Sequence, residues 1–445
     1  MSAETTPEQN LLIKNLQTLL NKNGQTQETS ATPIKKLRFL FVSTHTHQVT
    51  GYSKVAYGIL KELAAIPWLE VIHFGFQKFR AELPDTRKLP SNIEQIDASA
   101  LDKTVQQNGF GADALPTIIK ERQPHIVFIY NDLSVISQFM DSIKKSQVKR
   151  NFQLWLYVDQ VYTQQHMAYI DMINKESDRV FTFTQKWKEC LKEQGVHRPI
   201  DVLLHGFEPS MFPKIPRESA RKTLGLPDDL FLIMSLNRNQ PRKRLDTLIM
   251  AFVELIVKFP NKPIALMCVT DKGEKGGWWL FEVYMRELKL RGIDPLLYGN
   301  RLMITSRDMI YSDDEINVFY NVADIGISCA EGEGFGLCSF EQMGVGVPQV
   351  VPAIGGYVEF CNENNSQLVK PSWRYYLPTA QCPVGGEAHV CDPHAVCLAI
   401  EEYLLDSELR EKHGAAARNT VLQYTWEFAV KDLVKRLQRE YDDIV

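Results

Sequence analysis

One stretch, residues 323–351, constrains the fold of this chain more than any other. It opens with an apolar run, residues 323–329, of the kind that forms a buried strand. A short glycine turn follows, and apolar residues then recur at helical spacing at Phe340, Met343 and Val347. A strand, a glycine turn and a helix start place free backbone N–H groups at the carboxyl end of a strand, where open α/β sheets bind ligands. The stretch therefore predicts an α/β fold with a ligand site at the turn.

Two acidic residues flank this turn. Glu333 and Glu341 are separated by seven residues, which places Glu333 in the turn and Glu341 about two helical turns further on. We therefore expect the two carboxylates to be spread along the length of one ligand. The residues that form the turn and the start of the helix are Gly334, Phe335, Gly336 and Leu337.

A basic segment follows another apolar run, residues 230–236. Its Arg238 and Lys243 would lie at the carboxyl end of a strand and before a helix, where cations form a site for a diphosphate. A solvated basic turn without any ligand would have the same composition. Arg242 and Arg244, in the same segment, are expected to face solvent.

Together the two motifs resemble the signature of retaining glycosyltransferases of family 4. The family pattern is Glu-Gly-Phe-Gly-Leu, three residues, a second Glu and then Gly-x-Pro. This chain matches the pattern at Glu333, Gly334, Phe335, Gly336, Leu337, Glu341, Gly346 and Pro348. The family's diphosphate pattern, an Arg, four residues and a Lys, fits Arg238 and Lys243, and the Arg-Lys-Arg run resembles one branch in particular. The resemblance implies a GT-B fold, in which two Rossmann-like parallel-sheet domains face each other across a cleft.

The resemblance also implies a role for each motif. Glu333 and the amides of the turn would hold the donor sugar, and Glu341 would bond the ribose of its nucleotide. Arg238 and Lys243 would stabilise the leaving diphosphate, so that no catalytic metal is required. The departing phosphate would take the proton of the acceptor on the front face. The sugar would then keep its anomeric configuration without an enzymic nucleophile.

The expected protein is a metal-independent, hexosyltransferase-type enzyme whose substrate is a UDP- or GDP-sugar and which uses no further cofactor. The acceptor is not readable from the sequence. Two alternatives stay open. One is a sugar-nucleotide epimerase on the same fold, and the other is a non-catalytic protein that binds sugar nucleotides.

Two candidates come from the first half of the chain. Gly51 lies between the first predicted strand and its helix, where a glycine lets the backbone approach a phosphate or sugar closely. The alternative is that Gly51 is the N-cap of that helix. Asp159 ends the predicted strand 152–158 and could bind acceptor hydroxyls or position the attacking oxygen. Its alternative is a loop acid that caps the next segment.

Three further residues are candidates for the cleft. His205 lies at the joint between the two domains, and a hydrogen-bonded structural histidine is the favoured interpretation. His166 follows Asp159 by seven residues and could line the same cleft, although a surface position is favoured. Gly356 belongs to a Gly-Gly pair that is followed by Glu359, which fits a phosphate-side turn with a supporting acid.

Strand and helix patterns alternate along two parts of the chain, which predicts two parallel-sheet domains. The resemblance implies that the last helix crosses back to the first domain. Asp313, Asp314 and Glu315 are expected to cap a helix start. The expected units are a polar N-terminal extension with one helix (1–35), an acceptor domain (36–212), a nucleotide-sugar domain (213–425) and a C-terminal helix (426–445).

The composition excludes several classes of protein. The net charge of −4 argues against bulk binding of nucleic acid, which needs a basic face. No apolar run reaches the ~18 residues of a membrane span, which leaves only peripheral membrane contact open. The N-terminus lacks the pattern of a secretory signal. The eight cysteines contain no Cys-x-x-Cys pair, so we expect free thiols, no zinc site and a cytoplasmic location.

Overall fold

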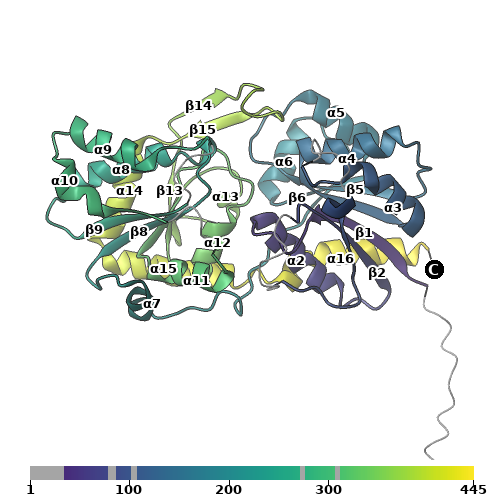
Figure 1. Ribbon diagram of the computed structural model, residues 1–445, viewed down its shortest axis with the longest axis horizontal. Helices are drawn as coiled ribbons and strands as arrows, with labels where there is room; N and C mark the ends of the chain where they lie inside the picture. Colours follow the sequence, from purple (N-terminus) through teal and green to yellow (C-terminus); the bar gives the residue numbers. More distant parts are fainter. Residues whose placement is uncertain (1–34, 79–86, 102–107, 271–275, 306–310, 445) are drawn as a thin grey trace, which may run out of the picture.

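The computed structural model describes residues 35–78, 87–101, 108–270, 276–305 and 311–444. Within them the chain forms two lobes, each built around a parallel β-sheet (Figure 1). The helix expected in the N-terminal extension lies outside these residues. No helix of the described part is both long and apolar enough to cross a membrane.

The first sheet has seven strands in the order β3-β2-β1-β4-β5-β6-β7, and all neighbours are parallel. Its strands are β1 (Leu37–Thr44), β2 (Leu69–Phe76), β3 (Glu94–Asp97), β4 (Ile126–Asp132), β5 (Gln153–Asp159), β6 (Arg179–Thr182) and β7 (Ile200–Val202). Its helices are α2 (Gly51–Leu63), α3 (Leu115–Arg122), α4 (Leu133–Lys145), α5 (Met167–Glu176) and α6 (Gln185–Glu193), with short 3-10 turns η1 (Ala98–Leu101) and η3 (Ala112–Ala114).

Helices cover both faces of this sheet, which explains why its central strands are apolar at nearly every position. Alternate residues of β1 enter two different buried clusters. Phe39 and Phe41 pack in the cluster that includes residues of α2, whereas Leu40 and Val42 pack in the cluster that includes residues of α4.

The second sheet has six strands in the order β10-β9-β8-β11-β12-β13, again all parallel. Its strands are β8 (Phe231–Leu236), β9 (Ile264–Val269), β10 (Leu302–Ile304), β11 (Ile325–Ile327), β12 (Gln349–Pro352) and β13 (Ser366–Val369). Its helices include α7 (Arg217–Leu224), α8 (Leu245–Lys258), α9 (Leu280–Leu290), α10 (Pro295–Tyr298), α11 (Asp313–Val322), α12 (Leu337–Gly344), α13 (Tyr357–Phe360), α14 (Pro393–Leu405) and α15 (Ser407–Val421). The predicted architecture of two Rossmann-like parallel-sheet domains is confirmed.

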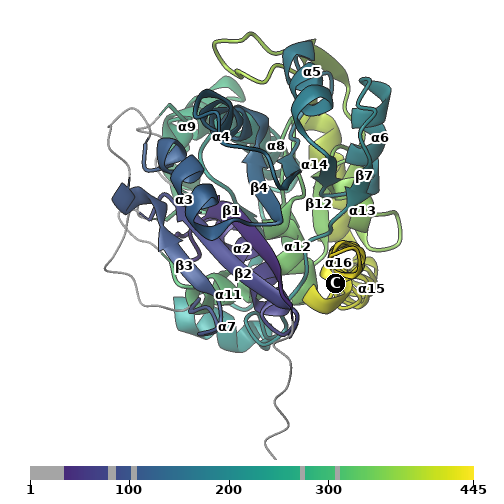
Figure 2. The ribbon, with the colours of Figure 1, turned by 90° about the vertical axis from the view of Figure 1, so that its right-hand side faces the viewer.

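The last helix, α16 (Trp426–Asp442), leaves the second lobe and packs on α2 and β1 of the first (Figures 1 and 2). Glycines make room for its first residue. A Cβ at Gly58 would lie 2.2 Å from the ring of Trp426, and a Cβ at Gly206 would lie 2.6 Å from the same residue. At the other end of the helix, the rings of Trp68 and Tyr441 stack with centroids 4.9 Å apart.

One element of the second lobe was not expected. An antiparallel hairpin of β14 (Trp373–Tyr376) and β15 (Glu387–Val390) extends toward the first lobe (Figure 1). Tyr375 Oη of the hairpin donates a hydrogen bond to Glu331, at 2.8 Å. The hairpin has short strands and exposed aromatic residues, so it carries little of the buried apolar pattern by which the other strands were predicted.

Candidate active site

A cavity of about 260 Å³ lies between the carboxyl ends of the two sheets. This is the place where the predicted motifs should meet if they bind one ligand. The cavity is lined by residues of both lobes. Those that had been predicted are Gly51, Asp159, His205, Arg238, Lys243, Glu333, Gly334, Phe335, Gly336, Leu337 and Glu341.

The glycine turn ends at the start of α12, as expected. Gly336 is the N-cap residue and has φ of +93°, a conformation that favours glycine. A Cβ there would also lie 2.5 Å from the ring of Tyr357. The first backbone N–H groups of α12 therefore border the cavity, where they can bind an anion.

Gly356 supports this turn from behind and does not line the cavity, so its predicted place in the cleft is wrong. Its backbone N–H donates to the carbonyl oxygen of Glu333 at 3.2 Å. A Cβ at Gly356 would lie 2.4 Å from the carbonyl oxygen of Gly334. The close backbone approach, and not a phosphate contact, accounts for a glycine at this position.

Glu333 forms a buried ion pair with Lys243, and the guanidinium of Arg242 lies 3.6 Å from the same carboxylate oxygen. Burial by itself would raise the pKa of Glu333, but the charges of Lys243 and Arg242 hold that pKa below its ordinary value. The carboxylate is thus ionised and fixed in place at neutral pH. Its remaining acceptor capacity faces the cavity.

The expectation that Arg242 and Arg244 face solvent is wrong. Arg242 lines the cavity and donates to the carbonyl oxygen of Gly332 at 3.2 Å. Arg244 pairs with Asp246 at 2.8 Å and lies 3.5 Å from Glu331. Both arginines are only partly exposed. Glu333 lies near Arg242, and Asp246 and Glu331 lie near Arg244.

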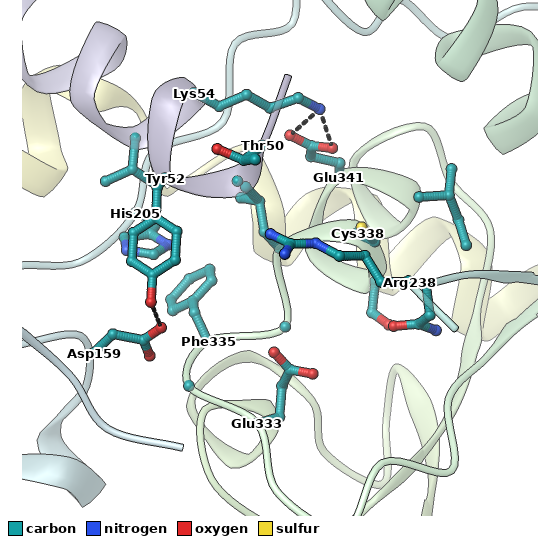
Figure 3. A pocket seen from close by; sticks show the side chains of 18 of the residues that line it. Thr50, Tyr52, Lys54, Asp159, His205, Arg238, Glu333, Phe335, Cys338 and Glu341 are labelled. Atoms are coloured by element: carbon teal, nitrogen blue, oxygen red, sulfur yellow. Dashed lines mark hydrogen bonds and ion pairs between the residues drawn. The ribbon is translucent and has the colours of Figure 1, made fainter. Parts of the chain in front are cut away.

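Arg238 differs from its neighbours. It is exposed, it lines the cavity, and its guanidinium has no ion-pair partner among the residues that the structure describes. Figure 3 shows its side chain extending into the cavity. An unpaired guanidinium at the carboxyl end of β8 is available for a bidentate contact with a phosphate group.

Glu341 is buried in the second turn of α12. Its carboxylate accepts hydrogen bonds from Lys54 Nζ at 3.1 and 2.9 Å and from Tyr320 Oη at 2.7 Å. Lys54 belongs to α2 of the first lobe, so this contact crosses the cleft (Figure 3). Neither Lys54 nor Tyr320 was predicted.

Asp159 stands at the end of β5, opposite the glycine turn. One carboxylate oxygen accepts a hydrogen bond from Tyr52 Oη, and the other has no partner among the described residues. Burial raises the pKa of Asp159 to about 6. A Cβ at Gly334 would lie 2.2 Å from the unpartnered oxygen, so the glycine leaves room for this acid. Asp159 therefore does not cap the next segment.

His205 lines the cavity, but its favoured interpretation as a hydrogen-bonded histidine is wrong. Its ring lies against Phe183 and Phe335, with centroids 4.5 and 4.3 Å away. Within the described part of the chain, neither ring nitrogen has a hydrogen-bond partner. Burial lowers the pKa of His205 to about 3, so the ring is neutral at physiological pH.

His166 is exposed at the N-cap of α5 and does not line the cavity, which agrees with the favoured surface position and not with a place in the cleft. Gly51 does line it, as the first residue of α2. The N-cap of α2 is Thr50, which forms a capping box with Ser53. The alternative in which Gly51 caps the helix is therefore wrong.

A second contact across the cleft was missed. Arg87 of the first lobe binds Asp313 of α11 at 2.9 Å, and Lys54 lies 3.5 Å from the same carboxylate. The N-cap of α11 is Ser312, which forms a capping box with Glu315. Asp313 lies in the acidic first turn of α11, as expected, and in addition joins the two lobes. Its position in a run of acids gave no signal for this.

Among the described residues, no group of three or more His, Cys, Asp or Glu side chains is arranged to hold a metal ion. All eight cysteines are free thiols.

Comparisons with known proteins relate part of this chain to glycosyltransferases. Residues 285–433, about a third of the chain, match the family described as "Family 4 Glycosyltransferase in conflict systems". The chain is 25% identical over 189 residues to D-inositol 3-phosphate glycosyltransferase 2 of Catenulispora acidiphila, covering 42% of each chain. It is 24% identical over 271 residues to the D-inositol 3-phosphate glycosyltransferase of Stackebrandtia nassauensis, covering 59% of this chain and 54% of the relative. The matches thus span about half the length of these relatives.

Solved structures share the fold over nearly the whole chain. Sucrose-phosphate synthase from Thermosynechococcus elongatus has a TM-score of 0.69 at 17% identity, covering 92% of this chain and 100% of that one. HepE from Anabaena, solved in complex with UDP-glucose, has a TM-score of 0.67 at 15% identity, covering 91% and 100%. These likenesses show the GT-B fold. The family match relates residues 285–433 to glycosyltransferase family 4.

Proposed function

We propose that this protein is a retaining glycosyltransferase that moves a sugar from a UDP- or GDP-sugar to an acceptor without a catalytic metal. One observation carries the proposal. A single cavity joins the unpaired guanidinium of Arg238, the Lys243–Glu333 ion pair and the first turn of α12. The family match and the likeness to a structure with bound UDP-glucose support it.

The cationic side of the cavity suits the leaving diphosphate. Arg238 and Lys243 lie near the start of α12, whose first N–H groups add a partial positive charge. Negative charge develops on the diphosphate as the bond to the sugar breaks. Preorganised donors at that position lower the barrier of the transfer.

The two glutamates suit the two ends of the donor. Glu333, ionised and held by Lys243, would accept hydrogen bonds from sugar hydroxyls. Glu341 would accept them from the ribose. Asp159 lies across the turn and would orient the hydroxyl of the acceptor. The bond between the anomeric carbon and the phosphate oxygen would break while the acceptor oxygen bonds that carbon on the same face. The departing phosphate oxygen would take the acceptor's proton.

A thermal-shift panel of UDP, GDP, ADP and their sugars, first with a chelator and then with magnesium, tests this function. One nucleotide series should raise the melting temperature equally well with and without metal. At 100 times its dissociation constant, it should add roughly 2.7 kcal/mol to the free energy of unfolding. Slow hydrolysis of the matching sugar nucleotide should then release the free sugar with retained configuration. Interconversion of the donor sugar would indicate an epimerase instead. Tight binding without turnover would indicate a binding protein.

Replacing Arg238 with alanine should lower kcat/KM for turnover of the sugar nucleotide by about 100-fold or more. The reason is the loss of a hydrogen-bond donor that points at the negative charge developing on the diphosphate. The melting temperature should change little, since the exposed guanidinium has no ion-pair partner in the described structure. Arg286→Ala, an equivalent change at an exposed position of α9, is the control and should leave both quantities unchanged. Equal losses of stability and activity in Arg238→Ala would contradict the assignment.

A further inference from the structure

Lys54 is the cation that reaches Glu341 from the opposite lobe. It stands in the first turn of α2, and its ammonium lies 3.1 Å from one oxygen of Glu341 and 2.9 Å from the other. Both side chains are largely buried, with 13% of the Lys54 side chain and 6% of the Glu341 side chain exposed. Figure 3 shows the contact at the edge of the cavity. Water therefore screens the pair little.

The hydrogen bonds already made by Glu341 limit what else it can bind. A carboxylate has about four acceptor positions, two on each oxygen. Oε2 accepts from Lys54 and from Tyr320, and Oε1 accepts from Lys54. Counting the donors among the described residues, one position on Oε1 is left. The two neighbouring hydroxyls of a ribose need two acceptor positions, so Lys54 must release at least one oxygen of Glu341. This step rests on the proposed function, in which Glu341 binds the ribose.

A second anion site lies within reach of the released ammonium. The starts of α2 and α12 face each other, since a Cβ at Gly51 would lie 3.5 Å from the side chain of Leu337. Cys338, in the first turn of α12, lines the same cavity as Lys54 and Lys243. Burial and the Glu341 carboxylate raise the pKa of this thiol, whereas the charges of Lys54 and Lys243 oppose that rise. Lys54 and Lys243 thus both lie close to the helix start that suits a diphosphate.

Asp313 gives Lys54 a second anionic neighbour at the cavity edge, in addition to Glu341. Its carboxylate lies 3.5 Å from the ammonium of Lys54. Arg87 fixes that carboxylate at 2.9 Å and also donates to Ser53 Oγ at 2.8 Å, beside Lys54 in the sequence. The lysine is therefore held at the cavity edge on one side and can change its partner on the other.

We propose that Lys54 is a specificity-determining residue, which exchanges the carboxylate of Glu341 for the diphosphate of the donor when the ribose binds. A nucleoside diphosphate supplies a new anion for the ammonium that its ribose displaces. A bare nucleoside breaks the same ion pair and supplies none. The exchange makes the protein select phosphorylated nucleosides over free ones, and it ties recognition of the ribose to contact with the first lobe.

Calorimetric titration with a nucleoside diphosphate and with its parent nucleoside, UDP and uridine or GDP and guanosine, tests the exchange. In Lys54→Gln, the diphosphate should bind about tenfold more weakly or worse, because a charge-assisted contact is lost. The nucleoside should bind more tightly than to the wild type, because no ion pair has to break. The ratio of the two dissociation constants is the quantity that decides.

Two variants separate the exchange from simpler effects. Arg238→Ala should weaken the binding of the diphosphate and leave the affinity for the nucleoside unchanged, since Arg238 has no contact with Glu341 to give up. Lys61→Gln removes another lysine of α2, whose ion pair with Glu208 is much more exposed, and should change neither affinity. Lys54→Arg keeps the charge, so it should keep the preference for the diphosphate and should show that position 54 tolerates substitution.

The inference would be overturned if Lys54→Gln weakened the binding of both ligands equally, or changed neither affinity. Lys54 would then act only as a structural link. Such a result with intact diphosphate binding by the wild type leaves the proposed function standing. Failure of the wild type to bind any nucleoside diphosphate would overturn the proposed function and this inference together.

Discussion

Asp159→Asn should make the protein more stable at neutral pH and at the same time strongly lower the rate of sugar transfer. The folded protein raises the pKa of this acid from 3.8 to about 6, chiefly through burial. The folded state therefore binds more protons than the unfolded state between these two values. The free energy of unfolding falls as the pH rises through this window and stays lower above it. A neutral asparagine removes that loss, which amounts to roughly 1–3 kcal/mol.

The loss of activity has a different cause. The unpartnered oxygen of Asp159 faces Gly334, beside the place proposed for the donor sugar. Asparagine can still accept the hydrogen bond of Tyr52, so the local packing should survive. It cannot provide a charged acceptor for a hydroxyl, and we expect transfer to fall by about 100-fold or more.

Melting curves between pH 4 and pH 8 measure the first effect. The melting temperature of Asp159→Asn should exceed that of the wild type above pH 6, and the two should converge toward pH 4. Asp141→Asn, an exposed position on α4, is the control and should follow the wild type. A less stable Asp159→Asn at pH 7.5, or one with full activity, would contradict this account of Asp159.

The parts of the fold that could be predicted are those whose signal is local. Buried parallel strands such as Phe231–Leu236 carry an apolar residue at nearly every position, because both faces of the sheet are covered. The turn before Leu337 combines a strand end, a glycine of positive φ and a helix start within a few residues. Such features depend on neighbours in the sequence, so a single chain displays them.

The pairing of charges across the cleft could not be predicted in the same way. Lys54 and Glu341 are 287 positions apart, and nothing near Lys54 indicates its partner. The error at Arg242 has the same origin. A run of cations looks solvated in the sequence, and only the fold brings Glu333 beside it. The prediction for His205 was wrong for a different reason. Aromatic rings lie against its ring, where a hydrogen-bond partner was expected.

The stability of the protein depends on how these long-range charges are paired, and the ion pair of Glu333 and Lys243 shows this best. Glu333→Gln should destabilise the protein by about 3–5 kcal/mol, because the buried ammonium of Lys243 loses its partner. Lys243→Met should cost less, since Arg242, 3.6 Å away, still compensates the carboxylate. Each change should lower donor turnover strongly. Chemical denaturation and steady-state kinetics measure the two effects.

The double variant Glu333→Gln with Lys243→Met distinguishes stability from catalysis. It removes both charges, and a buried pair replaced by neutral groups of similar size often costs little. Its stability should therefore exceed that of Glu333→Gln alone, with a coupling energy of about 1–3 kcal/mol in the cycle. Its activity should stay as low as that of the worse single variant, because the sugar and the diphosphate have both lost their partner. Recovery of activity together with stability would mean that the pair serves the fold, and that the donor binds elsewhere in the cavity.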